Sequence, residues 1–313
     1  MTQFLGTEDT ILFGSCFDAN GAVFEALLDE NDIMLSDRLV HASIIDGMRL
    51  SKAQHDTFKH SDMDHLRKKL ETFKAASRKM IITDGIFSTD GDLAHLDEIV
   101  SLAQEFDAIV VVDDSHATGF MGKSGRGTHE HFNVMGSIDL ISTTFGKALG
   151  GASGECVSGR KELIDILRQR GRPYLFSNTL SPVITYTTME VLRILDAHSE
   201  RRDTLLKNTT FWRGALNNAG FIVKDGESPI VPIMLHNVKL AQDLSFRLYE
   251  NGVYAVGFFF PVVPQGQARI RTQVSAAHTK HHLEQALDAF VKAGKELGIL
   301  GLSKDQLIER FGL

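Results

Sequence analysis

Short apolar runs alternate with longer amphipathic stretches from residue 9 to about residue 180. The runs predict strands at 11–13, 33–35, 80–83, 108–113 and 139–143, and apolar residues at helical spacing predict helices at 64–77 and 93–106. This alternation is typical of an α/β fold with a parallel or mostly parallel sheet. The run 109–112 is continuously apolar, which predicts a central strand covered on both faces.

The pattern changes after Pro182. Long, charged helices are expected over 183–218, followed by strands at 221–223, 230–235, 253–256 and 269–274 and by helices at 238–251 and about 280–297. We therefore expect two domains. A large cofactor-binding domain would span 1–185, and a linker helix with a smaller α+β domain would span 186–313.

Composition excludes several classes of protein. Of 313 residues, 43% are hydrophobic and 23% charged, which suits a globular protein, and no apolar run approaches the ~18 residues that cross a membrane. The net charge is -7 with scattered basic residues, so we expect no nucleic-acid partner. Cys16 and Cys156 cannot build a disulfide framework, which fits a reducing compartment.

Polar residues follow the apolar runs at four places: 14–17, 84–88, 113–116 and 143–147. In open α/β sheets, ligands bind outside the carboxyl ends of the strands, so these four edges are the candidate site. The other chemical signals are weak. His129-Glu130-His131 and His281-His282 lack the spacing of common zinc motifs, and we expect no metal site.

Lys147 and Asp113 together suggest one cofactor. Lys147 stands in Thr144-Phe145-Gly146-Lys147-Ala148-Leu149-Gly150-Gly151, and desolvation at a strand end would lower its amine pKa and favour a Schiff base. An exposed lysine in a glycine-rich turn is the alternative. Asp113 ends the central strand, where it would either cap the next helix or pair with a protonated pyridine nitrogen. The combination suggests pyridoxal phosphate (PLP).

Two further segments fit this cofactor. Residues 15–21 lead into a helical stretch at 22–28, whose N-terminus would offer N–H groups to a phosphate, although an ordinary capped helix is equally consistent. Thr144 would add a hydroxyl. His41 follows another strand and would cover the face of a planar ring, although such a histidine is more often structural. Cys16 is interpreted as a packing residue because no base lies nearby in the sequence.

These residues resemble the α-oxoamine synthases, PLP enzymes of fold type I. The resemblance extends over nearly the whole chain, and its motifs are Ser15-Cys16-Phe17-Asp18-Ala19-Asn20, Val40-His41-Ala42-Ser43, Asp84-Gly85-Ile86-Phe87-Ser88, Val112-Asp113-Asp114-Ser115-His116, Thr144-Phe145-Gly146-Lys147 and Arg269-Ile270-Arg271. The resemblance implies a mostly parallel large domain with a smaller α+β C-terminal domain.

The resemblance also implies a role for each matching residue. Lys147 would carry PLP and act as the base, Asp113 would pair with the pyridine nitrogen, and His41 would stack on the ring and contact the substrate. His116 would bind the phenolic oxygen, with Ser88 beside it. The remaining implied contacts are Cys16 and Phe17 through main-chain N–H groups, Thr144 to the phosphate, Ser177 and Asn178 from a second subunit, and Arg271 to the substrate carboxylate. Arg269 would be structural.

Two stretches are similar to those of family members that condense glycine with acetyl-CoA. They are Arg172-Pro173-Tyr174-Leu175-Phe176-Ser177-Asn178 and 257–273. The implied products are 2-amino-3-oxobutanoate and CoA, and the reverse reaction would serve threonine breakdown, with threonine dehydrogenase as a further partner. The alternatives are a 5-aminolevulinate or 8-amino-7-oxononanoate type of synthase, or a shortened non-catalytic subunit.

Family members carry an N-terminal stretch before the position that matches Met1, so the chain is interpreted as a fragment or a short form. A homodimer is expected, without membrane association. The compartment would be the cytoplasm of a bacterium or the mitochondrial matrix of a eukaryote.

Overall fold

The computed structural model of the protein describes residues 1–150 and 152–312. Gly151, the last residue of the glycine-rich motif, lies outside the described residues. Contacts divide the chain into two units. The first contains Met1–Phe87 and Leu93–Ser199, and the second contains Ser88–Asp92 and the chain from Glu200 onward.

The division between the units falls after Ser199 rather than after residue 185. The helix α9 (Pro182–Ala197) belongs to the first unit because Leu192 and Leu195 on this helix pack against the core of that unit. A second difference is the short segment Ser88–Asp92, which belongs to the second unit although the chain on either side of it belongs to the first.

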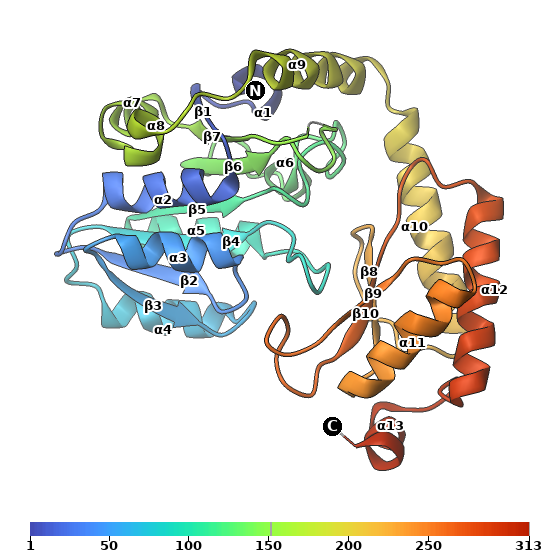
Figure 1. The fold of residues 1–313 in the computed structure, drawn as a ribbon. Coiled ribbons are helices and arrows are strands. Elements are labelled where there is room, and N and C mark those ends of the chain that lie inside the picture. The colour runs from blue at the N-terminus through green and yellow to red at the C-terminus, as the bar shows by residue number, and fades with distance from the viewer. Residues whose placement is uncertain (151, 313) are drawn as a thin grey trace. The chain divides into compact units, whose positions relative to one another are not determined.

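The first unit is built around a seven-stranded sheet (Figure 1). Its elements are α1 (Thr2–Leu5), β1 (Asp9–Phe13), α2 (Cys16–Leu27), β2 (Ile33–Asp37), α3 (Ala42–Leu50), β3 (Gln54–Phe58), α4 (Met63–Thr72), β4 (Lys79–Asp84), α5 (Leu96–Phe106), β5 (Ala108–Asp113), α6 (Thr128–His131), β6 (Leu140–Thr144), β7 (Glu155–Gly159), α7 (Lys161–Arg170), α8 (Arg172–Phe176) and α9.

The strand order is β1-β7-β6-β5-β4-β2-β3. The strands β6, β5, β4, β2 and β3 are parallel to one another, whereas β7 is antiparallel to both β1 and β6. Thus β1 runs in the same direction as β6. The expectation of a mostly parallel sheet is confirmed, and β5 lies at its centre as the continuous apolar run predicted.

Alternate residues of the central strands enter different cores on the two faces of the sheet. On β5, Val111 packs with α2, α3 and α7 in one core, whereas Val110 and Val112 pack with α4 and α5 in the other. The same alternation separates Met80 from Ile81 on β4. Because both faces are covered, only the ends of the strands remain for a binding site.

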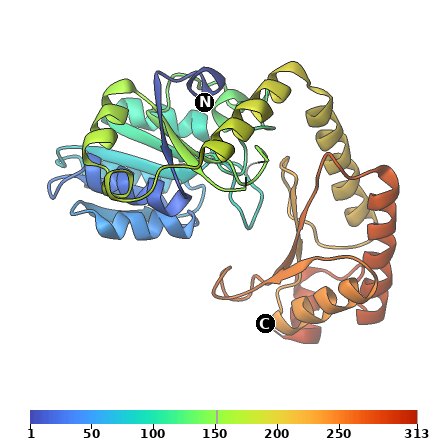
Figure 2. The ribbon, with the colours of Figure 1, turned by 45° about the horizontal axis from the view of Figure 1, so that its top comes forward.

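The second unit has a three-stranded antiparallel sheet of order β8-β10-β9. Its elements are α10 (Glu200–Asn218), β8 (Ile230–Met234), α11 (Val238–Glu250), β9 (Val256–Phe258), β10 (Arg269–Gln273), α12 (Lys280–Leu297) and α13 (Lys304–Phe311). The helix α12, red in Figure 2, contacts both α10 and α11. Trp212, Leu244, Ile270 and Phe290 meet in the core of this unit.

The predicted strands and those of the structure differ in several places. The polar segment of β3 was not predicted, because it is an edge strand in which only Phe58 is buried. The strand β7 was also missed, since it begins with a glutamate and contains few large apolar residues. The expected strand at 221–223 is reduced to a single bridge between Val223 and Ile233.

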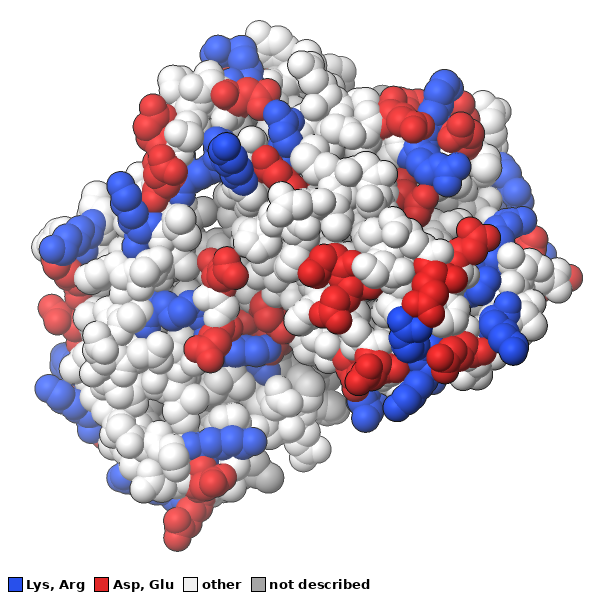
Figure 3. Space-filling model, turned by 180° about the vertical axis from the view of Figure 1, so that it is seen from behind, with Lys and Arg blue, Asp and Glu red and all other residues white. Residues whose placement is uncertain are grey.

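Basic and acidic side chains are interspersed on the face of the molecule shown in Figure 3. This distribution matches the scattered charges of the sequence. Among the helices that the structure describes, none is both long enough and apolar enough to cross a membrane.

Candidate functional site

The carboxyl ends of several strands meet at one edge of the large sheet. Asp84 at the end of β4 is in register with Asp113 at the end of β5, and Asp113 is in register with Ser142 of β6. Glu155 opens the antiparallel strand β7, where it is in register with Thr144 and Phe13. The residues that follow β1, β4, β5 and β6 therefore lie at this edge, as the sequence predicted. Glu155 also lies there, and the sequence did not predict it.

Asp113 is buried at the centre of this edge, with 5% of its surface exposed. Its Oδ1 accepts a hydrogen bond from the backbone N–H of Ser115 at 3.0 Å, and its Oδ2 accepts one from the thiol of Cys16 at 3.5 Å. No lysine or arginine of the described residues forms an ion pair with this carboxyl group. A buried carboxylate is costly without a cation, so the site is suited to a cationic ligand atom.

The helix α2 starts earlier than expected, at Cys16 rather than after Gly21. Ser15 caps it, with Oγ accepting from the N–H of Asp18 at 3.2 Å. The first N–H groups of a helix, here those of Cys16 and Phe17, have no acceptor within the helix and remain available to an anion. The early start therefore places two N–H groups that could bind a phosphate on the first turn of a helix whose Cys16 side chain contacts Asp113.

The thiol of Cys16 belongs to a hydrogen-bonded cluster. Its Sγ lies 3.1 Å from Ser43 Oγ and accepts from Asn20 Nδ2 at 3.3 Å. Burial, and then the negative charge of Asp113, raise the pKa of Cys16 well above its usual range. The side chain is a protonated donor, in agreement with a packing role.

His41 is the N-cap residue of α3. Its Nδ1 accepts from the N–H of Ser43 at 3.3 Å and lies 2.7 Å from Ser43 Oγ, which places the ring proton on Nε2. Burial lowers the pKa of His41, with a smaller contribution from the charge of Lys147. The ring is therefore neutral and fixed in orientation, and Phe17 contacts it edge-on at a centroid distance of 6.3 Å.

Lys147 is exposed in the turn that follows β6. The backbone N–H of Gly150 donates to the Lys147 carbonyl at 3.1 Å, which closes the turn. Thr144, at the end of β6, donates from Oγ1 to the Gly154 carbonyl and accepts from the N–H of Gly146, both at 3.1 Å. The positive charge of Lys147 acts on His41, Asp84 and Glu155.

Two further carboxyl groups lie at this edge: Asp84, which belongs to the expected segment 84–88 but was given no role, and Glu155, which the sequence analysis did not select. Burial, and then repulsion by Asp113, raise the pKa of both carboxyl groups well above the ordinary range. Asp84 Oδ1 accepts from the backbone N–H of His41 at 3.2 Å. Its position after the strand 80–83 was the signal that pointed to it, whereas Glu155 had no such signal because β7 was not predicted.

The other expected site residues are distributed over the chain. His116 is half-buried in the turn after Ser115, and Ser177 and Asn178 are exposed after α8. Ser88 and Arg271 belong to the second unit, in which the guanidinium Nη1 of Arg271 donates to the Ser88 carbonyl at 2.8 Å.

Arg269 is fully buried and holds the segment 88–92 within the second unit. Its Nη1 lies 2.7 Å from Asp90 Oδ1, and Lys224 Nζ approaches the same oxygen at 2.6 Å. Burial opposes ionisation of Asp90, but the hydrogen bond from Lys224 and the charge of Arg269 lower its pKa to about 2. This arrangement agrees with a structural role for Arg269.

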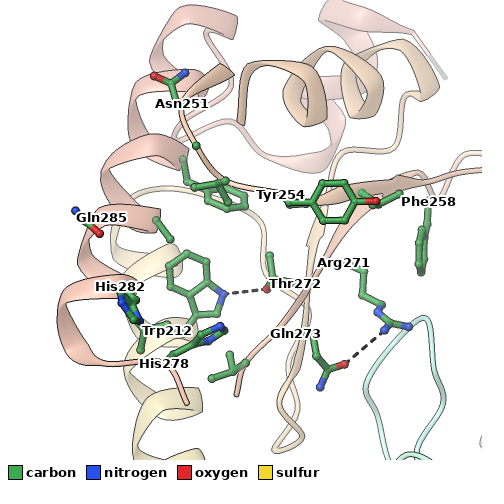
Figure 4. Close-up of a pocket in the computed structure, with 18 residues that line it drawn as sticks. Trp212, Asn251, Tyr254, Phe258, Arg271, Thr272, Gln273, His278, His282 and Gln285 are labelled. Carbon is green, nitrogen blue, oxygen red and sulfur yellow. Dashed lines mark hydrogen bonds between the residues drawn. The ribbon is translucent and has the colours of Figure 1, made fainter. Parts of the chain in front are cut away.

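A cavity of about 780 Å³ lies within the second unit (Figure 4). Arg271 lines it together with Trp212, Tyr254, Phe258, His278 and His282. The Trp212 indole donates to Thr272 Oγ1 at 2.9 Å, which fixes the wall formed by that ring. Of the residues expected at the site, Arg271 alone is among those that line this cavity.

The sheet, with an aspartate at the end of its central strand and a lysine after the next strand, defines the class of fold type I PLP-dependent transferases. The chain belongs to the aminotransferase class I and II family, whose model matches residues 1–290.

Several known proteins are similar to this chain. A 2-amino-3-ketobutyrate coenzyme A ligase of Escherichia coli K12 is 49% identical over 302 residues, covering 96% of this chain and 76% of the relative. The mitochondrial enzyme of that name from Bos taurus is 44% identical over 300 residues, covering 96% and 72%. An 8-amino-7-oxononanoate synthase of Thermosipho melanesiensis is 46% identical over 300 residues, covering 96% and 76%.

A solved structure described as SPT with a PLP internal aldimine superposes with a TM-score of 0.92 at 30% identity. The superposed region covers 96% of this chain and 75% of the chain of the solved structure. The predicted family and fold class are therefore confirmed.

Proposed function

We propose that the protein is a PLP-dependent glycine C-acetyltransferase. It would condense glycine with acetyl-CoA to 2-amino-3-oxobutanoate and CoA, or cleave that product in reverse. The observation that carries this proposal is the edge at which Asp113, His41, Lys147 and the N-terminus of α2 converge. The similarity to the ligase relatives supports acetyl-CoA as the acyl donor.

The residues at this edge fit PLP. Asp113 is a buried carboxyl group that lacks a cation among the described residues, which suits a protonated pyridine nitrogen. The N–H groups of Cys16 and Phe17 and the hydroxyl of Thr144 suit a phosphate. His41 is a neutral ring held by Ser43, which suits a planar cofactor face. When bound, PLP supplies an electron sink for the charge that develops on the α-carbon of the substrate.

The protein side chains would then perform the remaining steps. The amine of Lys147 would hold the cofactor and, in its neutral form, take a proton from the α-carbon of glycine. His41 would orient the acetyl group through its Nε2–H. Arg271 would bind the glycine carboxylate, while His116, with Ser88, would fix the cofactor ring. A bond forms between the glycine α-carbon and the acetyl carbonyl carbon, the thioester C–S bond breaks, and the sulfur leaves as CoA.

Borohydride reduction tests the cofactor part of the proposal. Reduction in the presence of PLP should leave a phosphopyridoxyl group on the peptide that contains Lys147, detected by mass spectrometry. Lys147→Ala should remove the label. Lys161→Ala should retain it, because Lys161 is an exposed lysine paired with Asp165. An unlabelled Lys147 peptide in the unmodified protein would refute the proposal.

A second candidate is a synthase of the same family with another acyl donor, which the 46% identity to an 8-amino-7-oxononanoate synthase favours. A panel of acyl-CoA thioesters with glycine, and with alanine as an alternative amino acid, distinguishes the two by the rate of CoA release. Faster turnover of a longer acyl-CoA would favour this second candidate. Absence of turnover with every donor, in a chain that binds PLP, would favour a non-catalytic subunit.

A homodimer is part of the proposal. Large apolar side chains are exposed on α8 and α9, including Phe176 at 79%, Val183 at 72% and Tyr186 at 73%, and they flank Ser177 and Asn178. Such a surface suits a contact with a second copy that receives these two residues. Sedimentation equilibrium should give the mass of a dimer, and Phe176→Glu with Tyr186→Glu should shift it toward the monomer. A monomer that binds PLP tightly would contradict this part.

In the cleaving direction, a threonine dehydrogenase would supply 2-amino-3-oxobutanoate. The relatives include bacterial and mitochondrial proteins. The compartment would accordingly be the bacterial cytoplasm or the mitochondrial matrix.

A further inference from the structure

Glu155 is a buried carboxyl group that the proposed reaction does not use. Its side chain lies at the start of β7 with 0% of its surface exposed. Oε1 accepts from the hydroxyl of Ser115 at 3.2 Å, whereas Oε2 is buried without a hydrogen-bond partner among the described residues. No arginine or lysine of the described chain forms an ion pair with it. Such a group needs a physical explanation.

Ser115 joins Glu155 to Asp113. The hydroxyl of Ser115 contacts Glu155, and its backbone N–H donates to Asp113 Oδ1 at 3.0 Å. One residue thus bridges two buried carboxyl groups that repel each other when both are ionised. The pair is therefore expected to carry a single negative charge.

The hydrogen bonds decide which carboxyl group carries that charge. Asp113 accepts two of them, from the N–H of Ser115 and the thiol of Cys16, and hydrogen bonds to a carboxylate favour its ionised form. Glu155 accepts one, from Ser115, and its second oxygen has no hydrogen-bond partner among the described residues. The nearby Thr144 hydroxyl also favours ionisation of Glu155, but it donates its proton to the Gly154 carbonyl at 3.1 Å. The proton therefore belongs on Glu155.

The other titratable groups around Glu155 do not change this assignment. Lys147, in the turn after β6, favours ionisation but is exposed to solvent and forms no ion pair with Glu155. Cys16 on α2 and Cys156 on β7 have raised pKa values and remain thiols. The carboxylate of Asp113 on β5 opposes ionisation.

We propose that Glu155 is a positioning residue that acts as a neutral carboxylic acid, holding Ser115 in place so that Asp113 is the one charged carboxyl group of the pair. The contact between Glu155 and the Ser115 hydroxyl fixes the turn in which the backbone N–H of Ser115 donates to Asp113. The consequence for the cofactor rests on the proposed function, in which Asp113 binds the pyridine nitrogen. The protonation of Glu155 itself does not depend on that function.

Infrared difference spectroscopy of the unliganded protein tests the protonation. At neutral pH the C=O stretch of protonated carboxylic acids should be present, and Glu155→Gln should remove the part of the band that comes from Glu155, leaving the part that comes from Asp84, whose pKa is also raised. Glu130→Gln serves as a matched control. Glu130 accepts from the N–H groups of Ser124 and Arg126, and these bonds lower its pKa against the effect of burial, so this variant should leave the band in place. A band that Glu155→Gln does not reduce would overturn the assignment.

Equilibrium dialysis against PLP tests the positioning role. Glu155→Gln keeps a neutral acceptor for Ser115 and should retain the wild-type Kd to within about twofold, whereas Glu155→Ala and Ser115→Ala should raise the Kd about tenfold. If Glu155→Gln and Glu155→Ala weakened PLP binding equally, a negative charge would be required and the proposal would be refuted. Wild-type affinity for PLP in Glu155→Ala would also refute it. If no variant and no wild-type protein binds PLP, the proposed function fails while the infrared result still decides the state of Glu155.

Discussion

Replacing Asp90 with asparagine should destabilise the second unit far more than the loss of an ordinary surface ion pair would. Asp90 Oδ1 lies between the Arg269 guanidinium at 2.7 Å and the Lys224 ammonium at 2.6 Å. The side chain of Arg269 is 0% exposed and that of Asp90 is 6% exposed. The substitution keeps the shape of the side chain and removes its charge.

The structure allows two estimates of the cost. Lowering the pKa of Asp90 from 3.8 to about 2 corresponds to about 2.5 kcal/mol of stabilisation in the ionised state. Removing one partner of a buried ion pair costs about 3–5 kcal/mol, because the remaining charge is left without compensation. Arg269 retains hydrogen bonds to Gln267 and to the Thr89 carbonyl, so we expect the lower end, about 3 kcal/mol.

Trp212 provides the assay. It is the single tryptophan of the chain and lies in the core of the second unit, so urea unfolding followed by its fluorescence reports on that unit. The free energy of unfolding of Asp90→Asn should fall by about 3 kcal/mol at pH 7. Because the folded pKa is depressed, the contribution of Asp90 is present above about pH 4 and is lost as the pH falls toward about 2. The difference between wild type and variant should shrink over that range.

Asp243→Asn is the control, since Asp243 pairs with Lys239 at 3.1 Å on the exposed surface of α11. Its cost should stay below about 0.5 kcal/mol. The reasoning would be refuted if Asp90→Asn and Asp243→Asn had equal effects at pH 7, or if the effect of Asp90→Asn did not change with pH.

Two further predictions concern the helices and the thiols. A Cβ at Gly47 would lie 2.7 Å from the Asn20 carbonyl oxygen, so Gly47→Ala should cost about 1–3 kcal/mol in thermal unfolding. Gly214→Ala, in an open position of α10, should instead stabilise by about 0.5–1 kcal/mol, and destabilisation there would contradict the packing argument. Cys16 and Cys156 have raised pKa values, so alkylation by iodoacetamide at pH 8 should be more than about tenfold slower than in urea.

The sequence was sufficient for those parts of the fold that follow local hydrophobic periodicity. The run 109–112 predicted the central strand because burial on both faces requires continuous apolar residues. The strand β3 was not predictable in this way, since an edge strand with one buried residue shows no such run. The helix α12 was predicted over 280–297, and the structure has it as Lys280–Leu297.

For the candidate site, the rule that ligands bind at strand ends selected Asp113, Lys147 and the segment before α2, and the structure brings these elements to one edge of the sheet. Glu155 was missed because its importance comes from a contact with Ser115, which is distant in the sequence. The pairing of Asp90 with Arg269 is likewise a long-range contact that no local pattern reveals.

The segment Ser88–Asp92 affects the order in which the protein can assemble during synthesis. The chain crosses between the units after Phe87, after Asp92 and after Ser199, so the second unit contains residues made early and residues made late. Asp90 leaves the ribosome long before Lys224 and Arg269 exist to pair with it. The second unit can therefore complete its buried ion pair only after most of the chain has been translated, and a nascent chain halted before residue 224 would carry an acidic loop without either partner.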